Sequence, residues 1–536
     1  MSHAARPRFE RGDALARLAD SEFDVLVVGG GITGAGVALD ATARGLRVAL
    51  VERDDFASGT SSRSSKLVHG GLRYLDQREF RLVYENLAER QLALENAPHL
   101  VRVLPFLVPV LTRGGRVGRK LAPFLGGALW MYDLTGGLRI GKRHHRVGID
   151  DALALFPTLS RERLAGAYVY YDAHADDARL TLAIVRTAVA HGAVALNYAE
   201  VVGFTHEAGR VSGVDVRVDG DTTHVRAHAV VNATGVWTDS VRELDEGHWT
   251  AASIRPAKGV HITLPWSRVR NASAAIVPSA HDRRSIFVIP WEGRTYVGTT
   301  DTDYAGSLDD PRCSAADTQY LLDALNEVTD IGATHEDVVG SWAGLRPLLS
   351  SPRRRRAART ADLSRRHDVR VAGSGMVTVT GGKLTTYRRM AADAVDAAVR
   401  VLGIDAPASP TRHLRLVGAD GVDAEAATAD HLLGRYGSDA ASVRALADAD
   451  PALAAPLVPG LPYLRAEAVY AARHEMAQTL DDVLSRRTRA RVLDRDASAD
   501  AAEAVATLLA PELGWGDERR DREVCAYRAA VVEEQR

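Results

Sequence analysis

The feature that most constrains this 536-residue chain is a glycine-rich turn between two short apolar runs near its start. Residues 23–28 are apolar except for Asp24 and indicate a buried parallel strand, and the sequence GGGITG follows at once from Gly29 to Gly34. Small and apolar residues then recur at helical spacing, and a second apolar run over residues 47–51 ends in Glu52. Strand, glycines, helix, strand and acid in this order within about 30 residues predict a dinucleotide-binding βαβ unit.

Each glycine of this G-x-G-x-x-G motif has its own task. Gly29 permits a tight turn, Gly31 lets the backbone approach a pyrophosphate, and Gly34 lets the helix pack closely on the strand. The helix start supplies N–H groups and partial positive charge to phosphates. Glu52, 23 residues after Gly29, can accept hydrogen bonds from a ribose diol. We therefore expect cofactor contacts from Gly29, Gly31, Ile32, Thr33, Gly34, Glu52 and Arg53.

Small hydroxylated residues crowd the segment just after this acid. Residues 58–66 read SGTSSRSSK, and such a loop can run along a cofactor with its backbone close and its hydroxyls donating hydrogen bonds. Residues 67–75 read LVHGGLRYL, where paired glycines after a histidine suit close approach to a flat ring. The alternative for this segment is a flexible Ser/Gly linker.

The segment 59–75 closely resembles the FAD-dependent glycerol-3-phosphate dehydrogenases, the aerobic bacterial and mitochondrial family. The resemblance continues in family order through YDAHADDARL at 171–180, VNATGVW at 231–237, FVIPW at 287–291, VGTTDTD at 297–303, GGKLTTYR at 381–388 and a C-terminal block at 475–489. It covers residues 20 to 395 before that last block. The resemblance implies that the cofactor is FAD.

The implied fold class is α/β, with three parts. They are an FAD-binding Rossmann-like domain of the glutathione-reductase and D-amino-acid-oxidase type, an antiparallel-sheet substrate domain, and a C-terminal α-helical cap domain. We expect an FAD-dependent oxidoreductase domain over residues 20–400 and a C-terminal helical domain over 408–536. The expected FAD-binding segments are 20–80, 165–240 and 368–400, and the expected substrate-binding segments are 81–164 and 241–367.

Further cofactor contacts are expected from the hydroxylated loop and from two glycine turns. One turn ends a buried strand at residues 229–235, and the other follows a predicted hairpin and precedes a helix at residue 384. Backbone N–H groups at that helix start would favour the negative charge that builds on a reduced flavin. The residues implied are Thr60, Ser61, Ser62, Ser65, Lys66, Leu67, His69, Gly70, Gly71, Ala233, Thr234, Gly235, Gly382, Lys383, Leu384 and Thr385.

The implied substrate, sn-glycerol 3-phosphate, needs cations for its phosphate, and the arginine fork matches phosphate oxygens. The candidates are Arg73, Arg346 and Arg365. Arg346 lies in the apolar sequence WAGLRP, where burial without an anion would be costly. Arg365 competes with Arg359 for the same role, and the nearby run RRRR at 353–356 indicates a solvated loop.

Oxidation of this substrate also needs a base for the proton of O2 while the C2 hydrogen leaves as hydride. His261, in the sequence KGVH, and His69 are both candidates, because a neutral imidazole suits proton abstraction near neutral pH. Lys383 is implied to point into the site, and Tyr74 and Thr386 can add hydroxyl contacts. The expected product is dihydroxyacetone phosphate.

Charge and cysteine usage exclude several partners. The chain has 67 basic and 69 acidic residues, so no global field attracts nucleic acid, and we expect none as a partner. Its two cysteines, Cys313 and Cys525, give neither metal spacing nor a disulfide framework, so we expect no metal and a reducing cytoplasm. The first 20 residues lack the apolar core of a secretory signal.

Two apolar segments, 103–111 and 121–132, are followed by basic residues. Such segments can lie on the inner face of the cell membrane, where a quinone would accept the electrons, as the family suggests. The alternative is buried packing beside the flavin domain. A homodimer is also compatible with the sequence.

Four other functions remain as alternatives. They are a glycerol-3-phosphate oxidase that uses oxygen, an amino-acid- or amine-oxidising flavoenzyme, an NAD dehydrogenase, and a flavin-bearing RNA-modification or scaffold protein. The last would need a basic surface, which this composition does not provide.

Overall fold

The glycine-rich start folds as its pattern predicts. In the computed structural model, which describes residues 9–72, 74, 79–112, 122–247, 253–279, 284–350 and 366–535, strand β1 (Glu22–Val28) leads into helix α2 (Ile32–Ala43) and then strand β2 (Val48–Val51). The two strands pair in parallel and are almost wholly buried. The predicted βαβ unit is therefore confirmed.

This unit forms the centre of an eight-stranded sheet with the order β17-β18-β10-β1-β2-β7, to which β9 and β8 add beside β10. Strands β7, β2, β1, β10 and β18 are parallel, while β9 and β17 run antiparallel to their neighbours. The added strands are β7 (Val194–Leu196), β8 (Glu200–Glu207), β9 (Arg210–Val218), β10 (Asp221–Asn232), β17 (His367–Val371) and β18 (Val377–Gly381). The hairpin predicted before residue 384 is β17–β18, and it is confirmed.

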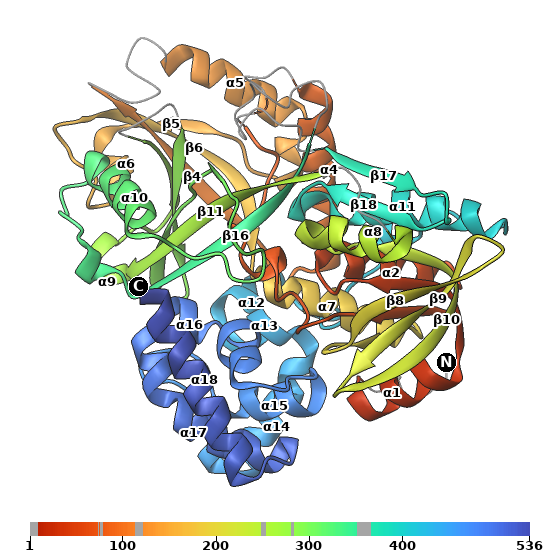
Figure 1. The fold of residues 1–536 in the computed structure, drawn as a ribbon. Coiled ribbons are helices and arrows are strands. Elements are labelled where there is room, and N and C mark those ends of the chain that lie inside the picture. Colours follow the sequence, from red (N-terminus) through yellow and green to blue (C-terminus); the bar gives the residue numbers. More distant parts are fainter. Residues whose placement is uncertain are drawn as a thin grey trace.

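A layer of helices packs against this sheet because its parallel strands are apolar. Helix α2 packs between α7 (Asp177–Ala190) and α11 (Tyr387–Leu402), and α1 (Arg11–Asp20) packs near β7. Figure 1 shows α7 and α11 on either side of α2, close to the N-terminal end of the described chain.

A second sheet has ten strands in the order β15-β11-β14-β13-β12-β4-β6-β3, with β16 beside β11 and β5 beside β6. Its pairs are antiparallel except β12–β4, which confirms the antiparallel sheet expected beside the Rossmann-like part. Its strands are β3 (Leu67–Val68), β4 (Val101–Leu111), β5 (His145–Val147), β6 (Leu164–Ala175), β11 (Ile254–Pro265), β12 (Ala274–Pro278), β13 (Ser285–Trp291), β14 (Arg294–Gly298), β15 (Thr302–Asp303) and β16 (Gly340–Leu349).

Among the described residues, five helices accompany this sheet. Helices α6 and α10 share its buried core, and α4 precedes the long strand β4. Figure 1 shows α5 at the end of the molecule farthest from the C-terminal helices. The helices are α4 (Phe80–Asn96), α5 (Ala122–Leu134), α6 (Ile149–Leu155), α9 (Trp266–Val269) and α10 (Ala315–Val328).

The C-terminal residues form the expected helical region, drawn in blue in Figure 1. Its apolar side chains and those of β4, β6, β13, β14 and β16 belong to one buried cluster, so the helices pack directly on the ten-stranded sheet. The helices are α12 (Ala424–Ala429), α13 (His431–Tyr436), α14 (Ala440–Ala449), α15 (Arg465–His474), α16 (Ala490–Leu493), α17 (Arg495–Leu513) and α18 (Asp517–Gln535). The fold class predicted from the sequence is confirmed.

The exact division into domains stays a prediction. Strands β3 and β6 lie in the ten-stranded sheet, although residues 67–68 and 165–175 fall inside the expected FAD-binding segments. The chain therefore passes between the two sheets more often than the segment boundaries expected from the sequence imply. No helix among the described residues is both long enough and apolar enough to cross a lipid bilayer.

Candidate functional site

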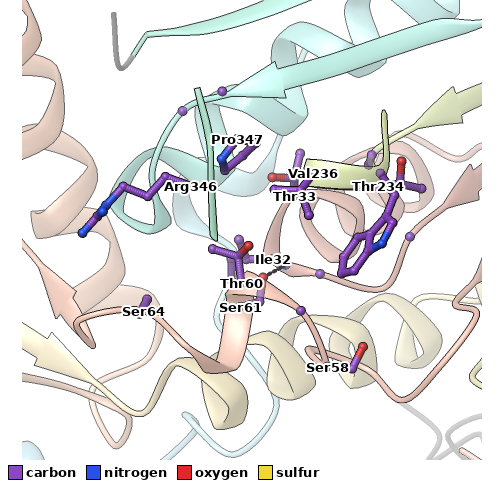
Figure 2. A pocket seen from close by; sticks show the side chains of 18 of the residues that line it. Ile32, Thr33, Ser58, Thr60, Ser61, Ser64, Thr234, Val236, Arg346 and Pro347 are labelled. Carbon is purple, nitrogen blue, oxygen red and sulfur yellow. Dashed lines mark hydrogen bonds between the residues drawn. The ribbon is translucent and has the colours of Figure 1, made fainter. Parts of the chain in front are cut away.

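A cavity of about 610 Å³ lies where the two sheets meet. It opens at the carboxyl ends of β1, β2 and β10, which is where open parallel sheets bind ligands. Strand β16 and the turn after β18 form the opposite wall. Figure 2 shows that wall contributing Arg346 and Pro347, across from Ile32 and Thr33 at the start of α2.

The turn after β1 forms a cradle that only glycine fits. Gly29 has a φ of +107°, and a Cβ atom there would lie 2.9 Å from the carbonyl oxygen of Ala233. A Cβ atom on Gly34 would lie 1.9 Å from the carbonyl oxygen of Gly29, so α2 touches the strand end directly. This close approach leaves the start of α2 open toward the cavity. The residues therefore fit a dinucleotide cofactor, whose pyrophosphate a helix start can bind.

Glu52 closes the end of β2 and lines the cavity. Its carboxylate accepts hydrogen bonds from the backbone N–H groups of Gly30, at 2.6 Å, and Asp54, at 2.9 Å. Burial nevertheless raises the pKa of Glu52 to about 7, because the charged form loses solvation that the two N–H groups only partly replace. Donors from a ribose diol would supply the missing hydrogen bonds.

The hydroxylated loop continues along the cavity as a short 3₁₀ turn, η1 (Thr60–Ser62). The backbone N–H of Ile32 donates to Oγ of Ser61 at 2.8 Å, drawn in Figure 2, and Thr60 Oγ1 donates to the carbonyl of Leu345 at 2.6 Å. The loop thus joins the start of α2 to strand β16. It is an ordered wall of the cavity, and the alternative of a flexible linker is wrong.

Charged side chains gather on the other wall. Arg346 donates to Oγ1 of Thr299 at 3.0 Å and lies 3.3 Å from a carboxylate oxygen of Asp301. Nζ of Lys383 lies 3.8 Å from the centre of the Tyr74 ring. Arg346, Lys383 and Tyr74 all line the cavity, so two cationic side chains contribute to this wall.

The two candidate bases occupy different positions. His69 lines the cavity, and its backbone N–H donates to Thr385 Oγ1 at 3.1 Å. His261 is buried and does not line the cavity; its ring stacks on that of Trp342, with 4.7 Å between the ring centres. Its Nε2 atom lies 2.9 Å from Oγ of Ser65, which does line the cavity. Burial, together with the charges of Lys66 and Arg346, holds the pKa of His261 well below its ordinary value of 6.5.

Most of the residues predicted from the sequence share this cavity. Those that line it are Gly29, Gly31, Ile32, Thr33, Glu52, Arg53, Thr60, Ser61, Ser65, Leu67, His69, Tyr74, Ala233, Thr234, Gly235, Arg346, Gly382, Lys383, Leu384 and Thr385. Those that do not line it are Gly34, Ser62, Lys66, Gly70, Gly71, His261 and Thr386. Arg73 and Arg365, with Arg359, lie outside the described residues.

The residues outside the lining have structural contacts instead. Lys66 is buried, and its ammonium group donates to Asp177 at 2.9 Å and to the carbonyl of Ser62 at 3.1 Å. Thr386 is buried beneath the turn after β18 and bonds to the carbonyl of Lys383. These side chains stabilise the backbone of residues that line the cavity or lie next to them.

The part of the cavity formed by Trp237, Leu308 and Asp309 was not predicted from the sequence. The indole N–H of Trp237 donates to Asp309 at 2.9 Å, and Arg53 pairs with the same carboxylate at 2.7 Å. Trp237 belongs to a block quoted for the resemblance, but the segment around Asp309 carries no motif that could have identified it.

Comparisons with known proteins agree with this geometry. The family model for FAD dependent oxidoreductases matches residues 24–388, and the model for the C-terminal domain of alpha-glycerophosphate oxidase matches residues 397–520. The chain is 43% identical to glycerol-3-phosphate dehydrogenase 2 of Mycobacterium bovis, over 98% of this chain and 91% of the relative. It is 39% identical to the human mitochondrial glycerol-3-phosphate dehydrogenase, over 94% of this chain and 72% of the relative.

Among solved structures, a glycerol-3-phosphate dehydrogenase from Bacillus halodurans complexed with FAD superposes with a TM-score of 0.76. It shares 33% sequence identity, and the match covers 98% of this chain and 96% of that one. An L-alpha-glycerophosphate oxidase from Mycoplasma pneumoniae, at 18% identity and a TM-score of 0.56, shares the fold. The family model and the relatives that match over almost the whole chain agree with the cavity between the two sheets. This protein therefore belongs to the FAD-dependent glycerol-3-phosphate dehydrogenase family.

Proposed function

We propose that this chain oxidises sn-glycerol 3-phosphate to dihydroxyacetone phosphate with FAD, and that the electrons pass on to a quinone. The observation that carries the proposal is the cavity itself. One wall is a dinucleotide cradle and the other presents Arg346 and Lys383, so a dinucleotide cofactor and a small anionic substrate can occupy it together. The names of the relatives support the choice of substrate.

FAD fits the first wall, where the start of α2 would bind the pyrophosphate and Glu52 a ribose diol. The turn at residues 382–385 would present its backbone to the flavin. When bound there, FAD supplies the hydride acceptor that no side chain can provide.

The chain's own side chains would then orient the substrate and move one proton. Arg346 would bind the phosphate through its fork, because Asp301 and Thr299 fix the guanidinium but leave it on the cavity wall. The proton of O2 would pass to Oγ of Ser65 and from there to Nε2 of His261, which is neutral and within hydrogen-bonding distance. His69, directly on the cavity wall, stays the alternative base.

Anaerobic mixing of the purified protein with glycerol 3-phosphate tests the substrate. We expect bleaching of the visible flavin bands by this ester, and none by glycerol or by an amino acid. Bleaching by an amino acid would instead support the amino-acid-oxidising alternative. The electron acceptor is tested by measuring turnover in air. Formation of peroxide at the rate of turnover would show that oxygen, and not a quinone, accepts the electrons.

The membrane side of the proposal rests on five exposed apolar side chains of α4 and α5, Phe80, Tyr84, Trp130, Met131 and Leu134, which we propose form one apolar patch. Five of the ten large apolar side chains that stand out as exposed among the described residues belong to it, with exposed fractions from 42% to 73%. Arg139 lies over Tyr84 and Arg143 over Trp130, each within about 5 Å, as measured to the ring centre.

Apolar side chains ringed by arginines fit an anionic lipid surface. The earlier apolar segment, 103–111, does not contribute, because it is the buried strand β4. We therefore propose peripheral contact through this patch at the inner face of the cell membrane, from the cytoplasmic side. A homodimer stays a prediction.

Sedimentation with vesicles of anionic phospholipid tests this contact. The double variant Trp130→Ser, Leu134→Ser should remain in the supernatant while the parent protein sediments. Trp266→Ser, which removes an equally exposed tryptophan on α9, is the matched control and should sediment. Equal sedimentation of both variants would contradict the role of the patch.

A further inference from the structure

The loop at residues 53–66 has two sides. One side lines the cavity through Ser58, Gly59, Thr60 and Ser61. The other side faces the C-terminal helical region, in particular a wide π-helical turn, η11 (Asp482–Arg487), and the residues that follow it. Contacts between the loop and the C-terminal region therefore fix the position of the loop residues that line the cavity.

The first contact is at Asp55, which is fully buried just after β2. Arg487 binds both of its carboxylate oxygens, at 2.6 and 2.8 Å, and Arg486 binds one of them at 2.6 Å. Burial alone would raise the pKa of Asp55, but the charges of Arg487 and Arg486 outweigh it and hold the pKa below its ordinary value. Two buried guanidinium groups on one carboxylate form a strong, directional contact.

The second contact is at the far end of the same loop. Arg489, also buried, donates to the carbonyl of Ser62 at 2.6 Å and to Asp177 at 3.0 Å. Asp177 in turn accepts from the backbone N–H and the hydroxyl of Ser64, at 2.9 and 2.7 Å, and from Lys66 at 2.9 Å. The loop is therefore fixed at both ends by arginines of the C-terminal region.

Between these two contacts lies the part of the loop that faces the cofactor. Ser61 is the residue whose Oγ meets the first N–H of α2, and it sits one residue before the carbonyl that Arg489 binds. A shift of the loop away from the arginines would open this hydrogen bond and widen the cavity along the start of α2.

We propose that Arg486, Arg487 and Arg489 are positioning residues for FAD, and that the C-terminal helical region is coupled to the cofactor through them. None of the three lines the cavity, so each acts through the loop. Because coupling between two sites is reciprocal, bound FAD should also stabilise the docking of the C-terminal region. The inference needs only FAD binding and holds for any substrate.

The test measures FAD affinity, by titrating each apoprotein with FAD and following the flavin fluorescence. Arg487→Lys keeps the charge but loses the two-pronged contact with Asp55, and we expect its dissociation constant to rise roughly 5- to 150-fold, the usual range of such coupling. Arg186→Lys is the matched control. Arg186 joins α7 to Asp439 of the C-terminal region at 2.8 Å but does not touch the loop, so its FAD affinity should change less than about twofold.

Circular dichroism of both apoproteins shows whether each is folded, and the proposal is overturned if folded Arg487→Lys binds FAD as tightly as the parent. It is also overturned if Arg186→Lys weakens FAD binding equally, because a general loss of docking would then explain the effect. A second measurement needs no variant. Hydrogen exchange of the parent protein should slow at residues 480–489 when FAD is added, and unchanged exchange there would refute the coupling.

Discussion

The two walls of the cavity are built by different means. On the cofactor wall, where we propose that FAD binds, the turn after β1 is a cradle of backbone atoms, because a Cβ atom on Gly29 or Gly34 would clash with a backbone oxygen. On the substrate wall we propose binding by long charged side chains, Arg346 and Lys383, which depend on partners from other segments such as Asp301 and Tyr74. A substitution that blocks the backbone cradle should abolish cofactor binding, whereas substitutions of single side chains on the other wall should each reduce activity only in part.

The cofactor wall should fail completely when one glycine gains a side chain. Gly34→Val would force α2 away from the end of β1, because its Cβ atom would lie 1.9 Å from the carbonyl oxygen of Gly29. We expect a protein without bound FAD that is less stable by about 3 kcal/mol or more. Flavin absorbance measures the bound FAD, and urea denaturation measures the stability. The control is Gly127→Ala on helix α5, because a Cβ atom there would meet no atom within 4 Å. A yellow Gly34→Val protein of normal stability would show that the cradle tolerates change.

On the substrate wall, the base should have the largest effect. His261→Asn and Ser65→Ala should each lower kcat by about 10²- to 10⁴-fold, the usual contribution of general acid–base catalysis. His69→Asn should cost less. Since the pKa of His261 lies well below 6.5, its imidazole is neutral above that pH, and the parent kcat should not fall as the pH is lowered to 6.5. Normal turnover by Ser65→Ala, with loss in His69→Asn, would transfer the role to His69.

Arg346 should show a smaller, graded effect. Removing its guanidinium leaves the substrate phosphate without its main cation, so Arg346→Gln should lower kcat/KM for glycerol 3-phosphate by roughly 10²-fold while FAD content is unchanged. Arg346→Lys should recover part of the loss. Arg255→Gln, which removes an exposed pair with Asp303 on the same sheet, is the control and should behave as the parent. Equal loss in both glutamine variants would argue against a phosphate site at Arg346.

The smallest effect should come from Glu52. With a pKa of about 7, Glu52 is protonated in much of the apoprotein below that pH, and a ribose diol would favour its ionised form. FAD binding should then release a proton, so affinity should rise with pH up to about 7 and level off above it. We expect a dissociation constant roughly tenfold higher at pH 6 than at pH 8, and no such slope in Glu52→Gln. A slope that persists in Glu52→Gln would exclude this carboxyl as its source.

The difference between the walls also explains what the sequence could predict. The cofactor wall is local: strand, glycines, helix and Glu52 lie close together in the chain, so their pattern alone predicts the βαβ unit. The substrate wall is not local, because Arg346, Lys383 and the segment with His69 and Tyr74 are far apart in the chain, and no single sequence pattern brings them together. That His261 lies behind Ser65, rather than on the cavity, depends on its stacking with Trp342, which no spacing reveals.

The role of the C-terminal region was the least predictable. The sequence showed no chemistry there, because the meaning of Arg486, Arg487 and Arg489 depends on their partners Asp55 and Asp177. A run of arginines is most often solvated, and only burial against a carboxylate distinguishes these from the others.

The contact between Asp55 and Arg487 joins residues 432 positions apart. During synthesis the ribosome delivers the nucleotide-binding segment early, yet the arginine that fixes its loop emerges only after residue 487 has been translated. We therefore expect the loop of a nascent chain to be incompletely fixed through most of its synthesis, exposed to proteases and without bound flavin. Messages truncated before this point should yield colourless, short-lived polypeptides even though every glycine of the opening motif is present.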